Sequence, residues 1–391
     1  MANVSSSNGL EKRPKLRFPG FDEPWEICKA ESLFRNITDK NHPDDTVLTI
    51  VQGKGTLPRD KSGRNIHYDD ASLSNYKRVE KGDFIIHLRS FEGGLEMAHE
   101  TGIVSPAYTI LRCSKPHSSL FYEAYFHTDE FINHVLSKAV EGIRDGRQIS
   151  YEAFKWLGIP YCTNAEQEKI SGLFDAINRR IEKQEQIVNA LKKYKRGLLS
   201  NLFSEKSTQG WTTSRYYFSE IAQRRGEKYD PSSGIEYPCV ELENIEQETG
   251  KILATVPSIE QGSIKNIAKS GDTLFGKLRP YLRKYAFAQQ TMACSSEIWA
   301  LIPSDVVLPK FLFYLVQTEQ FLRVANISSG TKMPRAEWSN IEKAEFYIPD
   351  LPVQRKVVSF LEGMDRKIAF ADSMLICLNR LKASLLQQLF I

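Results

Sequence analysis

The sequence lacks the marks of a secreted, membrane-embedded or metal-bound protein. Its six cysteines form no CxxC pair, so neither a zinc ribbon nor a disulfide framework is indicated. No apolar run approaches the roughly 18 residues of a membrane-spanning helix, and the polar opening MANVSSSNGLEKRPK has no hydrophobic signal core. We therefore expect a cytoplasmic protein with reduced thiols and no bound metal.

Motifs of common enzyme classes are missing as well. There is no GxxxxGK[ST] phosphate loop, no GxGxxG at a strand-to-helix turn, no Asn/Asp-Pro-Pro-aromatic box, no HExxH and no GxSxG. The GKGT segment at 53–56 is a lone glycine pair, which predicts a turn rather than a phosphate cradle. The seven histidines all lie between residues 42 and 134 and have no metal-ligand spacing. We expect a binding protein with no catalytic residues and no cofactor of its own.

Length and charge set the remaining bounds. A chain of 391 residues is expected to form two domains, each large enough for its own core. A hydrophobic content of 41% and a charged content of 26% are ordinary for a globular protein. The net charge of +4 permits nucleic-acid binding without requiring it.

The most informative feature is an internal repeat. The segment 166–203, which ends in LLSNLF, matches the segment 353–390, which ends in LLQQLF, and Gln167 matches Gln354. Weaker matches extend into the preceding residues, for example KGDFIIHLRS over SGDTLFGKLR. Repeat periods of 20 to 50 residues indicate solenoids, whereas this much longer offset indicates a duplicated domain.

Each copy of the repeat has a heptad-like apolar stripe, which predicts a long helix with one buried seam. The polar breaks in the two stripes, Lys195 and Lys382, fall in the same register. Each helix could pack on its own domain, but the matched breaks favour packing of the two seams on each other in antiparallel orientation. The predicted seam residues are Ile170, Phe174, Ile177, Ile181, Val188, Leu191, Leu198, Leu361, Met364, Ile368, Leu375, Leu378 and Leu385.

Short β-type runs and amphipathic helices, including 121–140 and 309–326, precede the long helices. The predicted fold is therefore α+β (mixed α/β), with two tandem similar domains, an antiparallel coiled coil of two long helices and a pseudo-two-fold. The predicted parts are a flexible tail 1–13, a first domain 14–162, a central helix 163–203, a linker 204–210, a second domain 211–350 and a C-terminal helix 351–391.

Basic residues with planar neighbours cluster in loops of both predicted domains. Arg and Gln are the usual readers of base edges, whereas Lys and backbone amides hold phosphates. A single cluster is typical of a solvated surface. Because matching clusters occur in both copies, a DNA-binding surface and a merely solvated surface are equally favoured. The candidate residues are Lys54, Arg64, Arg89, Arg144, Arg147 and Gln148 in the first domain, and Lys277, Arg279, Tyr281, Arg283, Lys332 and Arg335 in the second.

The order of these motifs, found twice, resembles the specificity subunits of Type I restriction–modification enzymes. PKLRFPGFDEPWEI (14–27) is similar to the usual opening of that family, and IPYCTNAEQEKI and IPDLPVQRKV are similar to its IPxPxxxEQxxI junction. LLSNLF and LLQQLF resemble the ends of its conserved helices. The first junction departs by lacking the second Pro, and the second has Val353 where the family usually has Glu.

This resemblance implies two target-recognition domains held apart by the conserved helices, each reading one half of a bipartite, asymmetric sequence in double-stranded DNA. It implies two partner methyltransferase subunits that carry S-adenosylmethionine, and restriction subunits that use ATP and Mg²⁺. The long helices would then set the number of unread base pairs between the half-sites.

Two other functions remain open on the sequence. A stand-alone bipartite DNA-binding regulator would need no methyltransferase, so weak DNA binding without a partner would argue against it. A coiled-coil scaffold without DNA binding would show no salt-sensitive affinity for DNA.

Overall fold

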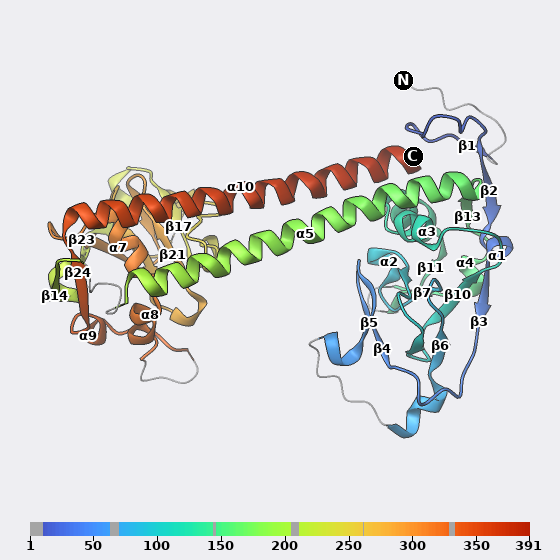
Figure 1. Cartoon of the computed structure of the whole chain (residues 1–391), viewed down its shortest axis with the longest axis horizontal. Coiled ribbons are helices and arrows are strands. Elements are labelled where there is room, and N and C mark those ends of the chain that lie inside the picture. Colours follow the sequence, from blue (N-terminus) through green and yellow to red (C-terminus); the bar gives the residue numbers. More distant parts are fainter. Residues whose placement is uncertain (1–10, 63–69, 144–145, 205–210, 261, 328–332) are drawn as a thin grey trace. The chain divides into compact units, whose positions relative to one another are not determined.

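The computed structural model describes residues 11–62, 70–143, 146–204, 211–260, 262–327 and 333–391, which form two compact units (Figure 1). Unit 1 comprises Met1–Glu185 with Met374–Ile391, and unit 2 comprises Gln186–Ser373. The long helices α5 (Asn164–Leu202) and α10 (Leu351–Phe390) each contribute one part to unit 1 and the other part to unit 2. Over the described ranges, no helix combines the length and the apolar composition needed to cross a membrane.

Unit 1 is built on a four-stranded antiparallel sheet of order β3-β10-β7-β8. A second, smaller sheet pairs β2 with β13 directly before α5 and carries β1 at its edge. The elements of unit 1 besides the long helices are β1 (Glu11–Lys12), β2 (Trp25–Lys29), α1 (Ala30–Leu33), β3 (Phe34–Ile37), β4 (Leu48–Val51), β5 (Gly55–Pro58), β6 (Lys77–Val79), β7 (Phe84–Ile86), α2 (Ser90–Gly93), β8 (Glu96–Met97), β9 (Gly102–Val104), β10 (Thr109–Cys113), α3 (Ser119–Phe126), β11 (Val140–Glu141), β12 (Gln148–Ile149), α4 (Tyr151–Phe154) and β13 (Gly158–Tyr161).

Unit 2 repeats this arrangement. Its four-stranded antiparallel sheet has the order β15-β23-β20-β21, and the pair β14–β24 precedes α10. A five-stranded sheet of order β16-β19-β22-β17-β18 completes the unit. Its elements are β14 (Thr213–Tyr217), α6 (Phe218–Ile221), β15 (Ala222–Arg224), β16 (Lys228–Tyr229), β17 (Pro238–Val240), β18 (Val256–Pro257), β19 (Lys265–Ala268), β20 (Thr273–Gly276), β21 (Tyr285–Phe287), β22 (Met292–Cys294), β23 (Ile298–Pro303), α7 (Pro309–Leu315), α8 (Glu319–Ala325), α9 (Trp338–Ile341) and β24 (Glu345–Pro349).

The predicted continuous helices 121–140 and 309–326 are each broken in the structure. The hydroxyl oxygens of Thr128 and Thr318 accept hydrogen bonds from the backbone N–H groups three residues further on. Each threonine also donates its hydroxyl proton to a carbonyl of the preceding turn. A side chain that caps a new helical turn competes with continuation of the old one, so the prediction of single helices was wrong.

Within each unit, the two long helices pack on each other and on the domain. In unit 1, Phe174 of α5 stacks on Phe390 of α10 with ring centroids 6.2 Å apart, and both lie in one core with Trp25. In unit 2, Leu199 of α5 shares a core with Leu361 of α10 and with domain residues. Helix–helix packing and helix–domain packing, which the sequence presents as alternatives, therefore occur together.

The predicted seam residues differ in how completely they are covered. Ile170, Phe174, Ile177, Val188, Leu361, Met364 and Ile368 are buried, whereas Ile181, Leu191, Leu198, Leu375, Leu378 and Leu385 are half-buried.

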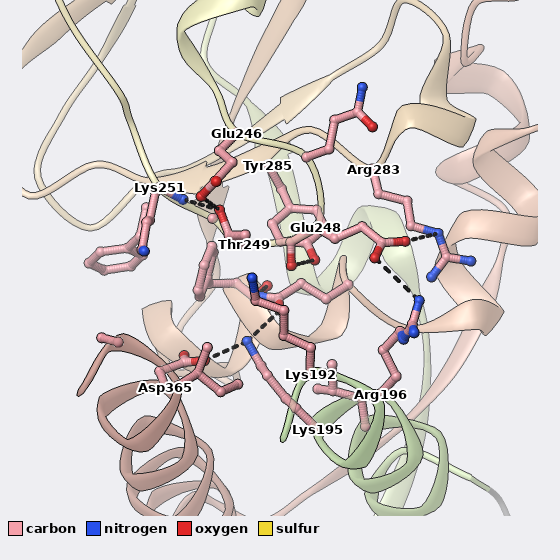
Figure 2. Close-up of a pocket in the computed structure, with 18 of the residues that line it drawn as sticks. Lys192, Lys195, Arg196, Glu246, Glu248, Thr249, Lys251, Arg283, Tyr285 and Asp365 are labelled. Atoms are coloured by element: carbon pink, nitrogen blue, oxygen red, sulfur yellow. Dashed lines mark hydrogen bonds and ion pairs between the residues drawn. The ribbon is translucent and has the colours of Figure 1, made fainter. Parts of the chain in front are cut away.

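Lys195, the polar break of the first stripe, is buried in a polar network of unit 2 (Figure 2). Its ammonium group lies 2.6 Å from the carboxylate of Asp365 in α10 and donates to Gln317 at 3.1 Å. The hydroxyl of Tyr314 in α7 donates to the same Asp365 at 2.7 Å. The network thus joins both long helices to the α7 segment, and it satisfies a lysine that would be costly to bury alone.

Lys382, the polar break of the second stripe, lacks such a network. It is half-buried in unit 1, and among the described residues no carboxylate lies within 4 Å of its ammonium group. Burial lowers the pKa of Lys382, and the more distant charge of Glu123 only partly opposes this.

The repeated glutamine fixes the start of each long helix. Gln167 and Gln354 are fully buried, and each donates to the carbonyl five residues before it, at 2.9 and 2.8 Å. The side-chain oxygen of Gln167 accepts from the N–H of Ser118, before α3, and that of Gln354 accepts from Leu308, before α7. The same side chain therefore locks a long helix to the same domain helix in both units.

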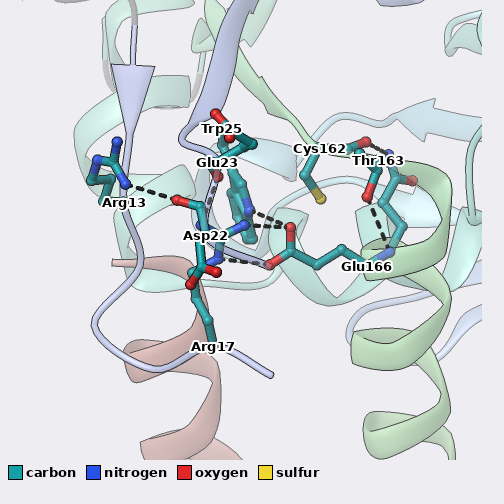
Figure 3. Close-up of polar contacts among 9 residues, drawn as sticks. Arg13, Arg17, Asp22, Glu23, Trp25, Cys162, Thr163 and Glu166 are labelled. Atoms are coloured by element: carbon teal, nitrogen blue, oxygen red, sulfur yellow. Dashed lines mark hydrogen bonds and ion pairs between the residues drawn. The ribbon is translucent and has the colours of Figure 1, made fainter. Parts of the chain in front are cut away.

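The residue before this glutamine differs between the units. Glu166 is buried and accepts two hydrogen bonds from Arg17, at 2.9 and 2.8 Å, and one from the indole N–H of Trp25 at 3.0 Å (Figure 3). The matching Val353 instead packs against the apolar core of unit 2, as does Trp211. The departure from the junction motif thus replaces an ion pair by apolar packing.

Candidate nucleic-acid interface

Unit 2 contains a cleft of about 540 Å³ beside β15, which is the edge strand of its four-stranded sheet. Cationic and amide side chains line it together with two tryptophans, and these include Gln223, Arg224, Lys228, Asn266, Lys277, Trp299 and Trp338. Exposed cations and amides beside aromatic rings are the groups that contact phosphates and bases.

Arg224 is held at this cleft by aromatic rings. Its guanidinium carbon lies 4.8 Å from the ring centroid of Trp338 and 5.9 Å from that of Trp299. The two tryptophans contact each other edge to face, and Phe275 stacks on Trp299 from the sheet. Arg224 is exposed, and no carboxylate of the described chain lies within 4 Å of its guanidinium group.

The next residue, Arg225, makes a salt bridge within the unit. It forms two hydrogen bonds with the buried carboxylate of Asp272, at 2.6 and 2.9 Å, and this contact raises the pKa of Arg225. In unit 1, the buried Asp83 accepts a similar pair of bonds from Arg112, at 2.8 and 2.7 Å, but Arg112 lies in β10 and is not at the position equivalent to Arg225. Each Asp follows a glycine at positive φ, so a Gly–Asp turn anchored by an arginine belongs to the shared framework.

The structure brings together two of the predicted basic segments of unit 2. Arg279 donates its backbone N–H to Pro334, and Ala336 donates to Lys277, both at 2.8 Å. Arg279 and Arg283 adopt left-handed backbone conformations, with φ of 50° and 52°, on either side of a turn that exposes Tyr281. The backbone thus holds 277–283 beside 333–336 on one surface.

The candidate cations of unit 2 differ in whether a carboxylate already neutralises them. Arg283 lies 2.7 Å from Glu319 and 3.5 Å from Glu248, and Arg335 lies 3.0 Å from Glu297. In the described ranges, Lys277 and Arg279 have no carboxylate within 4 Å. Lys277 and Arg279 are therefore better placed to meet a phosphate or a base edge than Arg283 and Arg335.

In unit 1, Lys54 lies at the exposed tip of the β4–β5 hairpin. The backbone N–H groups of Gly53 and Gly55 donate to the buried carboxylate of Glu96, at 2.6 and 2.8 Å. Burial opposes ionisation of Glu96, but the adjacent His127 and the two glycine amides hold its pKa below the ordinary value. The glycine pair therefore forms a turn, as predicted, and its amides bind a carboxylate of the protein itself.

The other candidates of unit 1 lie around α2. Arg89 directly precedes this helix and is exposed, without a carboxylate within 4 Å among the described residues. Arg147, from the β11–β12 hairpin, lies over the ring of Phe91 at 4.2 Å and 4.0 Å from Glu92. Gln148 is exposed in β12. The α2 turn and the β11–β12 hairpin thus present their polar groups together.

Three further candidates, Arg64, Arg144 and Lys332, lie outside the described residues.

A second pocket of unit 2, of about 460 Å³, is lined by charged residues of α5, α10 and the domain (Figure 2). Lys192 and Lys251 both lie 3.5 Å from Asp372, and Arg196 lies 3.3 Å from Glu248. Its charges pair with one another, which indicates a structural network. Across the described ranges, no cluster of three or more His, Cys, Asp or Glu side chains is placed to hold a metal ion.

A family model for the Type I restriction modification DNA specificity domain matches residues 219–376. Over this stretch the chain is therefore similar to the DNA specificity domain of Type I restriction–modification systems. The Type I restriction enzyme EcoDI specificity subunit of Escherichia coli is 26% identical over 191 residues, a match that covers 47% of this chain and 40% of that protein. The matched part therefore spans less than half of that relative.

Two solved structures have the same fold as this chain. One, from work on complex assembly and conformational transition of the type I R-M system, has a TM-score of 0.59 and 16% identity, and the match covers 96% of this chain and 99% of that one. The other, the Type I restriction-modification system S subunit from M. genitalium, has a TM-score of 0.53 and 15% identity over 97% and 99% of the two chains.

The sequence-based predictions missed the polar residues of the cleft beside β15. Gln223, Arg224 and Lys228 lie within QRRGEK, a basic run that was available as a signal. The two tryptophans that hold Arg224 lie far along the chain, so no local pattern connects them with it.

Proposed function

We propose that this chain is the DNA sequence-specificity subunit of a Type I restriction–modification complex. Each unit reads one half of a bipartite, asymmetric sequence in double-stranded DNA. One observation carries the proposal: the units share an internal framework but present unlike basic surfaces. Gln167 and Gln354 make the same bonds, whereas Arg224 of the unit 2 cleft lies where unit 1 has Asn36. Two readers on one scaffold suit two different half-sites.

The partners follow from the family and from the repeat. Two methyltransferase subunits that carry S-adenosylmethionine bind this chain, and restriction subunits supply the ATP- and Mg²⁺-dependent steps in the cytoplasm. Two similar units suit two identical partners, because each partner meets an equivalent face. The chain itself binds no cofactor and is not catalytic.

Methylation mapping tests this function. The genome of the host should contain methylated adenines in one split sequence, and those marks should disappear when this chain is deleted while the methyltransferase subunit is kept. Unchanged methylation would contradict the proposal.

The purified chain tests the non-catalytic part. Incubated with DNA and S-adenosylmethionine, or with DNA, ATP and Mg²⁺, it should leave the DNA unchanged, whereas addition of the methyltransferase subunit should restore methylation. Turnover by the chain alone would show that it is an enzyme. Strong, specific DNA binding without any partner would instead favour a stand-alone regulator.

A further inference from the structure

Arg224 combines three properties that the other cationic side chains in the described part of unit 2 do not share together. The guanidinium group is exposed, it is held over tryptophan rings, and within the described chain no carboxylate neutralises it. Arg225, Arg283 and Arg335 each have a carboxylate partner instead. Arg224 is thus a fixed cation with unused hydrogen-bonding capacity.

The contact with tryptophan determines which part of the guanidinium group stays available. An arginine that lies over a ring uses its planar face, and its five N–H donors lie in the plane. Those donors match the O6 and N7 acceptors of guanine in the major groove. Restricting the side chain beforehand also lowers the entropy lost when it binds a base.

We infer that Arg224 is a specificity-determining residue of unit 2 that reads a guanine in its half-site, and that Trp338 and Trp299 are the residues that position it. This inference rests on the proposed function, because it names a base contact within the DNA interface. The neighbouring Gln223, an amide that can pair with adenine, lines the same cleft.

The comparison with unit 1 supports a base-reading role for Arg224 over a role in the stability of the fold. In the first strand of each four-stranded sheet, Arg224 pairs with Leu301 and Asn36 pairs with Leu111, so Asn36 occupies the equivalent position. Strand β10 of unit 1 contains no tryptophan, and α4 begins with Tyr151 where α9 begins with Trp338. The arginine and its rings are therefore absent from the shared framework, as expected if the two half-sites differ.

The test uses the complete methyltransferase complex and a set of duplexes in which each base pair of the target is changed in turn. Arg224→Lys keeps the charge but removes the planar fork. It should reduce discrimination at one guanine of one half-site by about 5- to 100-fold. Discrimination at every other position, and the salt dependence of binding, should stay the same.

Trp338→Leu provides a readout that a direct contact alone would not give. This variant keeps Arg224 but removes the ring that restricts its side chain. Discrimination between bases should therefore fall at the same guanine, and by less than in Arg224→Lys. Trp338→Phe keeps an aromatic ring under the guanidinium group and should retain most of the discrimination at that guanine. Arg215→Lys is the matched control, because Arg215 is exposed, pairs with Glu345 and lies outside the cleft.

Each outcome is decisive. Equal weakening of all duplexes by Arg224→Lys would make Arg224 a phosphate contact and overturn the inference, as would an unchanged profile. If the unmodified complex shows no sequence preference, the proposed function itself fails. If that complex discriminates normally and only the Arg224 prediction fails, the proposed function stands.

Discussion

Units 1 and 2 repeat the same framework but differ where side chains meet solvent or charge. Both have a buried glutamine at the start of the long helix and a Gly–Asp turn held by an arginine. They differ at the junction, where Glu166 is replaced by Val353, and at the edge strand, where Asn36 is replaced by Arg224. The duplicated domain thus keeps the glutamine bonds at the start of its long helix, and it varies a core contact beside them and an exposed side chain on the edge strand.

The two polar breaks show that a repeated residue need not keep a repeated environment. Lys195 is buried and bonded to Asp365 and Gln317, whereas Lys382 is only half-buried and has no close carboxylate among the described residues. Identical residues at matched positions therefore contribute differently to stability.

The largest expected effect comes from making unit 1 resemble unit 2 at the junction. Glu166→Val removes the acceptor of Arg17 and of the buried Trp25 indole. Removing one partner of a buried ion pair costs about 3–5 kcal/mol, so unfolding of the chain in urea should begin at clearly lower concentration. Glu168→Val, at an exposed position two residues further along α5, should change the free energy of unfolding by about 0.5 kcal/mol or less. Equal effects would show that the Glu166 network is not structural.

The two lysines provide the next test. Lys195→Met removes the only ammonium donor that the network offers to Asp365 and the buried Gln317, and Asp365 keeps the Tyr314 hydroxyl. This change should cost about 1–3 kcal/mol of stability. Lys382→Met should leave stability at neutral pH unchanged or raise it, because burial disfavours the charged form. The lowered pKa also means that the unfolded chain binds the proton more readily, so the contribution of Lys382 to the free energy of unfolding should rise with pH up to the ordinary lysine value near 10.5. Thermal unfolding of both variants across this pH range measures their stability relative to wild type. A larger loss of stability in Lys382→Met than in Lys195→Met would contradict the contrast between the two lysines.

A smaller effect concerns histidine, which occurs only in the part of the chain that forms unit 1. The hydrogen bond with Glu123 raises the pKa of His99. The stability it contributes is therefore fully present below the unfolded histidine pKa of about 6.5 and is lost as pH rises through the raised folded value. His99→Gln should destabilise the protein most at low pH within its stable range, and this loss should shrink as pH rises.

Glu123→Gln is the control for the histidine prediction. In that background, His99→Gln should have the same small effect at every pH. A loss of stability that instead grows with pH in the Glu123-containing protein would reverse the assigned sign.

Much of the fold could be predicted because the repeat and the heptad stripe are patterns along the chain. Both long helices and the α+β character follow from them. The breaks at Thr128 and Thr318 were missed, because an amphipathic pattern continues across them while a single hydroxyl group decides the backbone.

The candidate site was less accessible to sequence reasoning. Basic clusters are visible in the sequence, but their partners are not. Glu297, which pairs with Arg335, and Trp338, which holds Arg224, are brought in by strand pairing over long separations. Whether a cation is neutralised or available depends on such contacts.

The most direct test of the account is exchange of one reading unit. Residues 14–160 would be replaced by the matching domain of a relative with a different target, and the assembled complex would be examined by mapping methylated adenines. If each unit reads its own half-site, one half-site should change to that of the relative that supplied the domain, and the other half-site should stay the same. A change in both half-sites, in a folded and active complex, would contradict the claim that the two units read DNA separately.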